Sequence, residues 1–240
     1  MNIDAKAMHF KDLNAQIRDC ADRQVVIDNC LGQRYIGTGL NHKDIIINGL
    51  PGNALGAYLD GSQIIVNGST QEATGDTMND GKIIIYGNAG DATGYAMRGG
   101  KIFVRGNSGY RTGIHMKEYQ DKVPVIVIGG RVGSFLGEYQ AGGVIIVLGI
   151  GQAGELPVGY FTGTGMHGGK IFLRSDNEPQ GLPPQVICRV ANTEDKDAIM
   201  GYVSEFCANF GGDPEELLNQ KFYLLMPNTA NPYKQLYVNN

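Results

Sequence analysis

The 240-residue chain lacks the features that mark several common classes of protein. It has no apolar run approaching 18 residues and no apolar segment behind its N-terminus, so we expect neither a membrane-spanning helix nor a secretory leader. Four cysteines without a CxxC pair give no recognisable zinc or iron–sulfur site. No lysine or arginine cluster stands out and the formal net charge is −4, which argues against a nucleic-acid partner. We expect a cytoplasmic protein with free thiols.

What the chain has in abundance is glycine, 36 residues of it, and much of it falls in a repeat of 19 residues. A fixed period near 20 residues is typical of a solenoid. We interpret the recurring glycines as structural turn positions that need a positive φ. These corner glycines are Gly37, Gly56, Gly75, Gly94, Gly113, Gly137 and Gly163. A column of apolar residues shares the spacing, namely Val26, Ile45, Ile64, Ile83 and Ile102.

Each repeat carries one triplet of large apolar residues, rich in Ile and Val and bounded by glycine. Such a triplet predicts a short β-strand, and no window of the repeats shows helical spacing. The spacings of leucine-rich repeats and of left-handed hexapeptide helices are also absent. The sequence therefore predicts a mainly β fold, a right-handed single-stranded parallel β-helix of about 7–8 coils. An N-terminal capping helix and a C-terminal helical extension would complete it.

The repeat continues beyond residue 106 with two insertions. The steps between successive triplets become 24, 19 and 26 residues, which places extra residues near 117–122 and 150–157. Insertions in a solenoid form surface loops. We therefore expect both insertions to be docking surfaces for a partner.

Alternation along each strand divides the triplets into inner and outer columns. The first and third residues, from Ile45 and Ile47 to Ile171 and Leu173, point to the same side and predict the interior. The middle residues then form an apolar stripe larger than the ~300–600 Å² patch of a typical monomer. Either the chain's own terminal helices or a partner protein must cover it. This stripe is Ile46, Ile65, Ile84, Phe103, Val127, Ile146 and Phe172.

The pattern divides the chain into three parts. Residues 1–24 form an N-terminal cap with an amphipathic helix over 10–22, and residues 25–175 form the β-helix. Residues 176–240 form an extension that opens with a linker rich in Pro and Gly. A strand over 186–190 follows, then a helix capped by Thr193 and ended by Gly211, and a second short helix beginning at Asp213. The last residues, 230–240, are either a tail that docks on a partner or a frayed end.

The sequence shows little chemistry. A G-x-x-x-G element ends on five of the corner glycines, but strands follow it rather than the helix of a phosphate-binding loop, so turn glycines are the better interpretation. Arg111, His115 and His167 lie on turns and are candidates for binding an anion, as is the pair Glu138–Tyr139. No column of aligned acids or bases exists. We expect no catalytic, cofactor-binding or metal-ligating residue in this chain.

Several segments nevertheless carry a family resemblance. IDAKAMHF (3–10), DNCLGQRYIGTGL (28–40), GDATGYAMRGGKIFVRGNSGYRTGIHM (90–116) and GTGMHGGKIFLR (163–174) resemble the GXGXG domain. That domain is the β-helical C-terminal module of the glutamate synthase large subunit, here as a stand-alone chain. A related β-helix forms one of the subunits of formylmethanofuran dehydrogenase.

The resemblance implies a structural subunit of an oxidoreductase, without catalytic residues of its own. Its expected partners are a glutaminase-type amidotransferase subunit and a synthase subunit that holds FMN and iron–sulfur, with a homo-oligomer as a further option. Two alternatives stay open. One is a β-helical scaffold of a formylmethanofuran dehydrogenase-type enzyme, and the other is an independent β-helix protein that acts on or binds carbohydrate.

Overall fold

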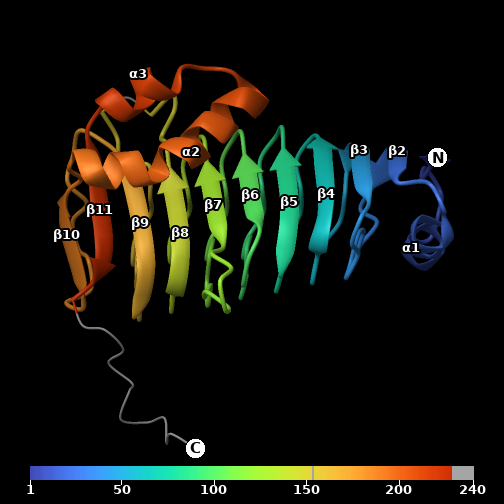
Figure 1. Cartoon of the computed structure of the whole chain (residues 1–240), viewed down its shortest axis with the longest axis horizontal. Coiled ribbons are helices and arrows are strands. Elements are labelled where there is room, and N and C mark those ends of the chain that lie inside the picture. The colour runs from blue at the N-terminus through green and yellow to red at the C-terminus, as the bar shows by residue number, and fades with distance from the viewer. Residues whose placement is uncertain (153, 229–240) are drawn as a thin grey trace, which may run out of the picture.

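The computed structural model describes residues 1–152 and 154–228 and is mainly β (Figure 1). The predicted tail, 230–240, lies outside the described residues. The helices are α1 (Phe10–Asp19), α2 (Thr193–Phe210) and α3 (Pro214–Asn219). The strands are β1 (Asn2–Asp4), β2 (Gln24–Leu31), β3 (Asp44–Leu50), β4 (Asp60–Asn67), β5 (Asp80–Ile85), β6 (Lys101–Val104), β7 (Val125–Ile128), β8 (Ala141–Val147), β9 (Gly168–Arg174), β10 (Val186–Val190) and β11 (Phe222–Pro227).

The described strands form one 11-stranded sheet that runs along the whole molecule (Figure 1). From β1 to β9 each strand pairs with the next in chain order, and all these pairs are parallel. Next to β9 lies β11, and β10 is outermost; both of these pairs are antiparallel. The sheet does not close, so β1 and β10 are its two edges. Every predicted apolar triplet lies in a strand, in β2 to β9.

The predicted register is wrong by one residue in the first repeat. Val25, not Val26, pairs with Ile45, and Val25 is fully buried whereas Val26 is half-buried. The reason is a bulge in β2 between Ile27 and Cys30, where the offset between the strands changes from 20 to 19 residues. A bulge adds one residue to one strand of a pair, and spacing alone does not reveal it.

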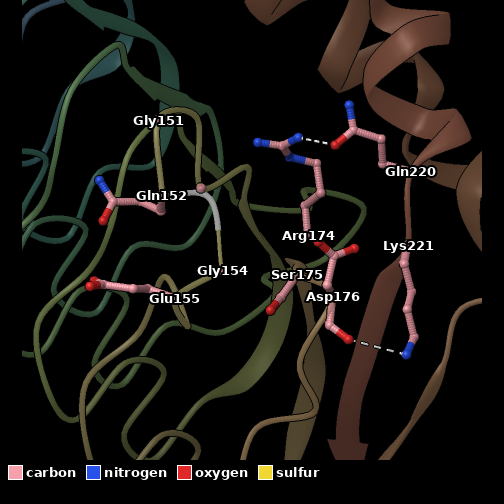
Figure 2. Close-up of a pocket in the computed structure, with 10 residues that line it drawn as sticks. Gly151, Gln152, Gly154, Glu155, Arg174, Ser175, Asp176, Gln220 and Lys221 are labelled. Atoms are coloured by element: carbon pink, nitrogen blue, oxygen red, sulfur yellow. Dashed lines mark hydrogen bonds between the residues drawn. The ribbon is translucent and has the colours of Figure 1, made fainter.

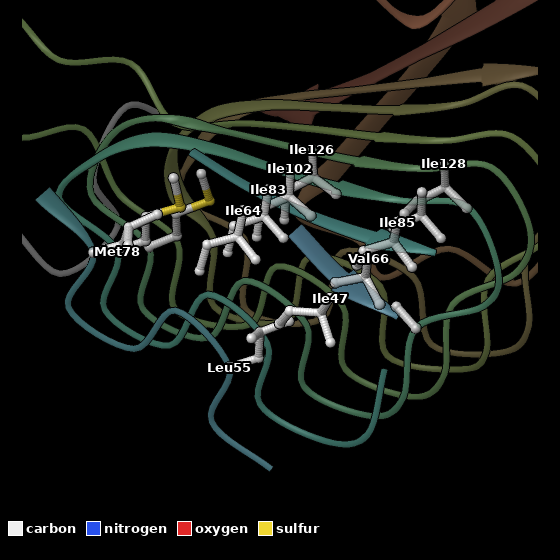
Figure 3. Packing of buried hydrophobic residues seen from close by; sticks show 14 of the residues in the cluster. Ile47, Leu55, Ile64, Val66, Met78, Ile83, Ile85, Ile102, Ile126 and Ile128 are labelled. Carbon is white, nitrogen blue, oxygen red and sulfur yellow. The ribbon is translucent and has the colours of Figure 1, made fainter. Parts of the chain in front are cut away.

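The interior columns are confirmed. Figure 3 shows Ile64, Ile83, Ile102 and Ile126 in one row, with a second row of third-column residues beside it. All four are fully buried. Because identical side chains stack in register between units, the core repeats along the sheet with the period of the sequence.

The corner glycines lie directly against this core. All seven have a φ between 64° and 76°. A Cβ at Gly94 would lie 2.4 Å from Cδ1 of Ile126, and one at Gly56 would lie 2.6 Å from Cδ1 of Ile83. Successive corners are hydrogen-bonded, as in the bond of 2.7 Å from the Gly94 N–H to the Thr74 carbonyl. The corners therefore need glycine both for its backbone conformation and for its lack of a side chain.

The outer stripe is largely covered by the chain itself. Five of its members, Ile84, Phe103, Val127, Ile146 and Phe172, are at most 4% exposed. They form a second core with Ile199, Val203, Phe206 and Cys207 of α2, Leu218 of α3, and Phe222 and Leu224 of β11. Figure 1 shows α2 lying across this face of the sheet. Only Ile46 and Ile65 remain half-buried, so a partner has access to that end of the stripe alone.

The N-terminal part contains the predicted helix, but it differs from the prediction in detail. Leu13 and Ile17 of α1 are fully buried, but the helix ends at Asp19 and leaves Ala21 exposed. The sequence did not predict β1, because three residues are too few to show a period and the strand exists through its pairing with β2.

The C-terminal part follows prediction more closely. The strand β10 is confirmed, as is α3 with Asp213 as its N-cap. The N-cap of α2 is Asn192 rather than Thr193, in a capping box with Asp195. The strand β11 was missed, since its run of apolar residues does not alternate.

Candidate interaction surface

The corner of each repeat displays side chains on both sides of its glycine. The residues two positions before and after a corner glycine also have a positive φ, for example Arg111 (58°) and His115 (56°) around Gly113. Phe135 (64°) and Tyr139 (54°) flank Gly137 in the same way. Because the corners stack unit on unit, these side chains form two ladders along the molecule.

The first ladder contains Arg111, Phe135 and Phe161. The rings of Phe135 and Phe161 are stacked with centroids 4.9 Å apart, and the Arg111 guanidinium lies 4.9 Å from the Phe135 centroid. Arg111 also forms an ion pair of 2.9 Å, from Nε to Oε2 of Glu138. Phe161 is 57% exposed at the end of the ladder.

The second ladder contains His115 and Tyr139, and Tyr95, which directly follows Gly94, lies beside it. His115 and Tyr139 are stacked at 5.1 Å with an interplanar angle of 9°, and Tyr95 meets His115 edge-on at 5.8 Å. Tyr139 extends over Gly165 of the next unit, where a Cβ would lie 2.4 Å from Cδ1 of the tyrosine. Gly165 thus makes room for the ring.

We call the surface formed by both ladders and the adjoining tyrosines the aromatic corner. Tyr110 and Tyr160 extend it and are 53% and 79% exposed. Clustered exposed aromatic rings with an arginine are typical of a protein interface. The aromatic corner comprises Tyr95, Tyr110, Arg111, His115, Phe135, Glu138, Tyr139, Tyr160 and Phe161.

The structure brings together four residues that the sequence singled out separately. Arg111, His115, Glu138 and Tyr139 all belong to the aromatic corner. His167 lies in the following unit, with Nδ1 3.1 Å from the Gly165 carbonyl oxygen. Sequence reasoning missed the half-buried ring of Phe135 and the exposed rings of Tyr160 and Phe161. The available signal was their position two or three residues before a corner glycine.

A second candidate is a cavity of about 310 Å³ beside β9 (Figure 2). Arg174 donates from Nη1 to Oε1 of Gln220 and from Nε to the Leu148 carbonyl, and Lys221 donates to the Asp176 carbonyl at 3.3 Å. Burial lowers the pKa of Arg174, and nearby Asp176 opposes this. Two basic and two acidic side chains line the cavity, so it has no net charge that would select an ion. The lining charges are Arg174, Lys221, Glu155 and Asp176.

The two insertions behave differently. The first folds back along the stack, because Lys122 forms ion pairs with Asp80 at 3.1 Å and Asp60 at 3.6 Å. It leaves Tyr119 half exposed. The second carries Glu155, which lies 3.9 Å from Arg131, and exposed Ile150.

Metal clusters and membrane-spanning helices are not found in the described chain. Across residues 1–152 and 154–228, no group of three or more His, Cys, Asp or Glu is placed to hold a metal ion. In the same residues, no helix combines the length and the apolar character needed to cross a membrane.

Comparisons with known proteins identify a family, a relative and several solved chains with a similar fold. The family model of the GXGXG motif matches residues 6–228. An uncharacterized protein of Methanocaldococcus jannaschii is 46% identical over 249 residues, which cover 98% of this chain and 95% of that protein. The fold is similar to that of a chain in the formyltransferase/hydrolase complex (FhcABCD) of Methylorubrum extorquens, solved with methylofuran. That alignment has a TM-score of 0.65 and 19% identity, and covers 92% of this chain and 88% of the other.

Proposed function

Because the chain belongs to the GXGXG motif family, we propose that it is a non-catalytic structural subunit of a multi-subunit enzyme of the glutamate synthase type. Such a complex makes glutamate from glutamine and 2-oxoglutarate. This chain would hold a glutaminase-type amidotransferase subunit and an FMN/iron–sulfur synthase subunit in register, in the cytoplasm. Its own residues would bind neither cofactor. The resemblance of residues 90–116 and 163–174 to the glutamate synthase module supports this choice.

The finer architecture belongs to the same proposal. We propose that the stacked units wind as a right-handed single-stranded parallel β-helix. Parallel strand pairing at a 19-residue offset supports this, as do hydrogen bonds between successive corners, such as Gly113 N–H to the Thr93 carbonyl at 2.8 Å. A winding of this kind suits a scaffold, because it displays a long surface whose parts keep fixed distances.

The aromatic corner is the observation that carries the scaffold proposal. The chain covers most of its apolar stripe with α2, yet it leaves this second aromatic surface open. Stacking and corner hydrogen bonds hold the rings before any partner arrives, which lowers the entropy cost of binding. Interface energy is concentrated in such aromatic and arginine anchors. We therefore assign the aromatic corner to contact with a partner protein of the complex.

Two other functions have an observation in their favour. The solved structure with a similar fold is a chain of a formyltransferase/hydrolase complex, which favours a scaffold in that class of enzyme. The exposed rings of Tyr160 and Phe161 favour a carbohydrate-binding protein, because exposed rings can stack on sugar rings. All three hypotheses make the aromatic corner a binding surface, but they differ in what binds there.

Affinity purification of the tagged full chain from its native cells, with mass spectrometry, tests the proposal. We expect a glutaminase-type protein and an FMN/iron–sulfur protein to be recovered in fixed proportion. The double substitution Tyr160→Ser and Phe161→Ser should reduce their recovery at least tenfold, since both rings are exposed anchors. Tyr58→Ser is the matched control, because Tyr58 is exposed at the equivalent corner of an earlier unit.

Three other outcomes would count against the glutamate synthase assignment. Recovery of formyltransferase or hydrolase subunits would transfer the proposal to that class of enzyme. Recovery of the chain alone, at normal abundance, would contradict a subunit role. Retention by an oligosaccharide column that Tyr160→Ser abolishes would favour the carbohydrate-binding alternative.

A further inference from the structure

The outer edge of β10 is an unpaired edge of the sheet. Its sequence, VICRV, consists mostly of residues that favour strands, and Ile187 and Val190 are 43% and 52% exposed. The strand carries one charge, on Arg189, and Asp195 binds that guanidinium at 2.5 and 2.9 Å. An exposed apolar edge strand is a template for a further strand.

The hydrogen bonds around β10 show which of its backbone groups face outward. The Ala191 N–H donates to the Phe222 carbonyl, and the Asn228 N–H donates to the Gln185 carbonyl. Antiparallel pairs alternate between bonded and non-bonded residues. Gln185, Ile187, Arg189 and Ala191 are therefore bonded to β11. The N–H and C=O groups of Val186, Cys188 and Val190 point away from it.

Two of these outward groups already have partners in the same chain. The Val186 N–H donates to the Pro183 carbonyl at 2.9 Å, and the Val190 carbonyl accepts from Nη1 of Arg189 at 3.2 Å. The structure records no partner, among the described residues, for the Cys188 N–H and C=O, the Val190 N–H and the Val186 C=O. Two donors and two acceptors are therefore open.

We propose that β10 pairs with β10 of a second copy of this chain, antiparallel about a two-fold axis at Cys188. In that register Cys188 lies opposite Cys188 of the second copy, and Val186 lies opposite Val190. The two cysteines exchange two hydrogen bonds, and each Val190 N–H donates to the opposite Val186 carbonyl. One further bond per copy would run from the Val186 N–H of one chain to the Val190 carbonyl of the other. Both of these groups already have a partner within their own chain.

The side chains suit the same arrangement. Val186 and Cys188 pack against the main core and are only half-buried, so the pairing would join the cores of two chains. On the other face, Ile187 would lie opposite Arg189 of the second copy. The two Arg189 side chains are therefore not paired with each other, and no like charges meet. A two-fold contact also closes on itself, whereas pairing of β10 with β1 of another copy would continue into a filament. The edge at β1 has only three residues, and Asp4 carries a charge there.

Sedimentation of the purified full chain over a wide concentration range tests the pairing. We expect a dimer, and we expect Cys188→Ala to preserve it because the backbone N–H remains. Cys188→Pro removes that N–H, which makes no bond within the described part of the chain, and proline is accepted at the outer side of edge strands. The dissociation constant should rise at least about tenfold, since two hydrogen bonds are lost per dimer.

A thiol cross-link gives an independent readout. Bonded antiparallel residues have Cα atoms ~5.5 Å apart, so a short bifunctional thiol reagent should link two chains through Cys188, and Cys188→Ala should abolish that link. A monomer at every concentration would overturn the proposal, as would a Cys188→Pro dimer as tight as the parent. Growth into larger assemblies would also overturn it. If Cys188→Pro fails to fold, Val190→Pro provides the same test, because the Val190 N–H also faces outward.

Discussion

At the scale of single residues, the corner shows two separate reasons for a glycine. One is a left-handed backbone, and the other is a lack of space for a side chain. Ala92 has a φ of 54° and Gly94 a φ of 72°, so both are in the left-handed region, yet only one is glycine. The difference is space, because a Cβ at Gly94 would lie 2.4 Å from Ile126. Non-glycine residues incur a modest conformational cost in this region, roughly 1–2 kcal/mol each. At the central corner position, glycine is therefore needed because the core leaves no space for a side chain.

The first prediction compares two glycines with similar backbones. Gly94→Ala should destabilise the chain by about 2–4 kcal/mol, since it adds both strain and a clash with the Ile126 column. Gly39→Ala should cost only about 1 kcal/mol, because Gly39 has a φ of 64° but nothing within 4 Å of its Cβ position. Urea unfolding measures both. Equal losses would show that conformation alone explains the corner glycines.

The second prediction concerns the buried thiol of Cys30, which lies 3.4 Å from Oε1 of Gln33. Burial raises the pKa of this thiol from 9.0 to about 11. Because the folded pKa lies above the unfolded one, the contribution to stability is complete below pH 9 and is lost as the pH rises from 9 to 11. Cys30→Ala should remove this part of the alkaline loss. Unfolding free energies at several pH values would test it, and parallel curves for both proteins would contradict it.

At the scale of elements, α2 is held on the sheet by polar contacts as well as by its apolar face. Glu205 lies between Lys82 and Lys101, with a distance of 2.6 Å to Nζ of Lys101. Burial raises the pKa of Glu205, but the bonds from Lys101 and Lys82 outweigh it, so the pKa is lowered overall. One turn further along α2, the Tyr86 hydroxyl donates to the Asn209 carbonyl at 3.1 Å. These contacts fix where the helix lies on the stripe.

The third prediction removes an anchor of α2. Phe206 is 1% exposed and contacts the stripe and Phe210, with ring centroids 4.9 Å apart in the latter pair. Phe206→Ala should destabilise the chain by about 3–5 kcal/mol, because it leaves a cavity between α2 and the sheet. Phe161→Ala, at an exposed ring of the aromatic corner, should change stability by less than about 0.5 kcal/mol. Thermal and urea unfolding give both values, and similar losses would contradict the assigned burial.

The elements predicted well are those whose signal is local. Triplets such as Ile83 to Ile85 lie between glycines at a fixed period, so their strands and inner columns followed from spacing. The bulge beside Asn29 and the pairing of β1 depend on neighbouring strands, and neither leaves a period. The aromatic corner needed a third kind of information, the left-handed backbone that exposes residues on both sides of each corner glycine. A repeat predicts what every unit shares, whereas the surface that we propose for binding depends on residues that only some units have.

At the scale of the whole molecule, three surfaces differ in what covers them. The face carrying the stripe is covered by α2, the aromatic corner is open, and the edge at β10 has unpaired backbone groups. Stacked repeating units can carry separate contacts of this kind because each unit touches only its neighbours. A partner at the corner and a second copy at the edge would therefore bind without competing for the same residues.

The last prediction uses this modularity. Deletion of residues 50–68 removes one complete period and joins Gly49 to Ser69, so Ile45 would pair with Ile83 in the register it now shares with Ile64. The buried members of the stripe under α2 all lie on β5 and later strands, so the deletion removes only half-buried Ile65 from the packing against this cluster. We expect a folded chain with a smaller urea m-value, because less surface is exposed on unfolding. Its free energy of unfolding should be lower by the contribution of one repeating unit. Deletion of residues 50–59 is the control and should abolish folding, since it shifts every later corner by half a period. Circular dichroism with urea unfolding distinguishes them, and failure of the full-period deletion would show that the units are not independent.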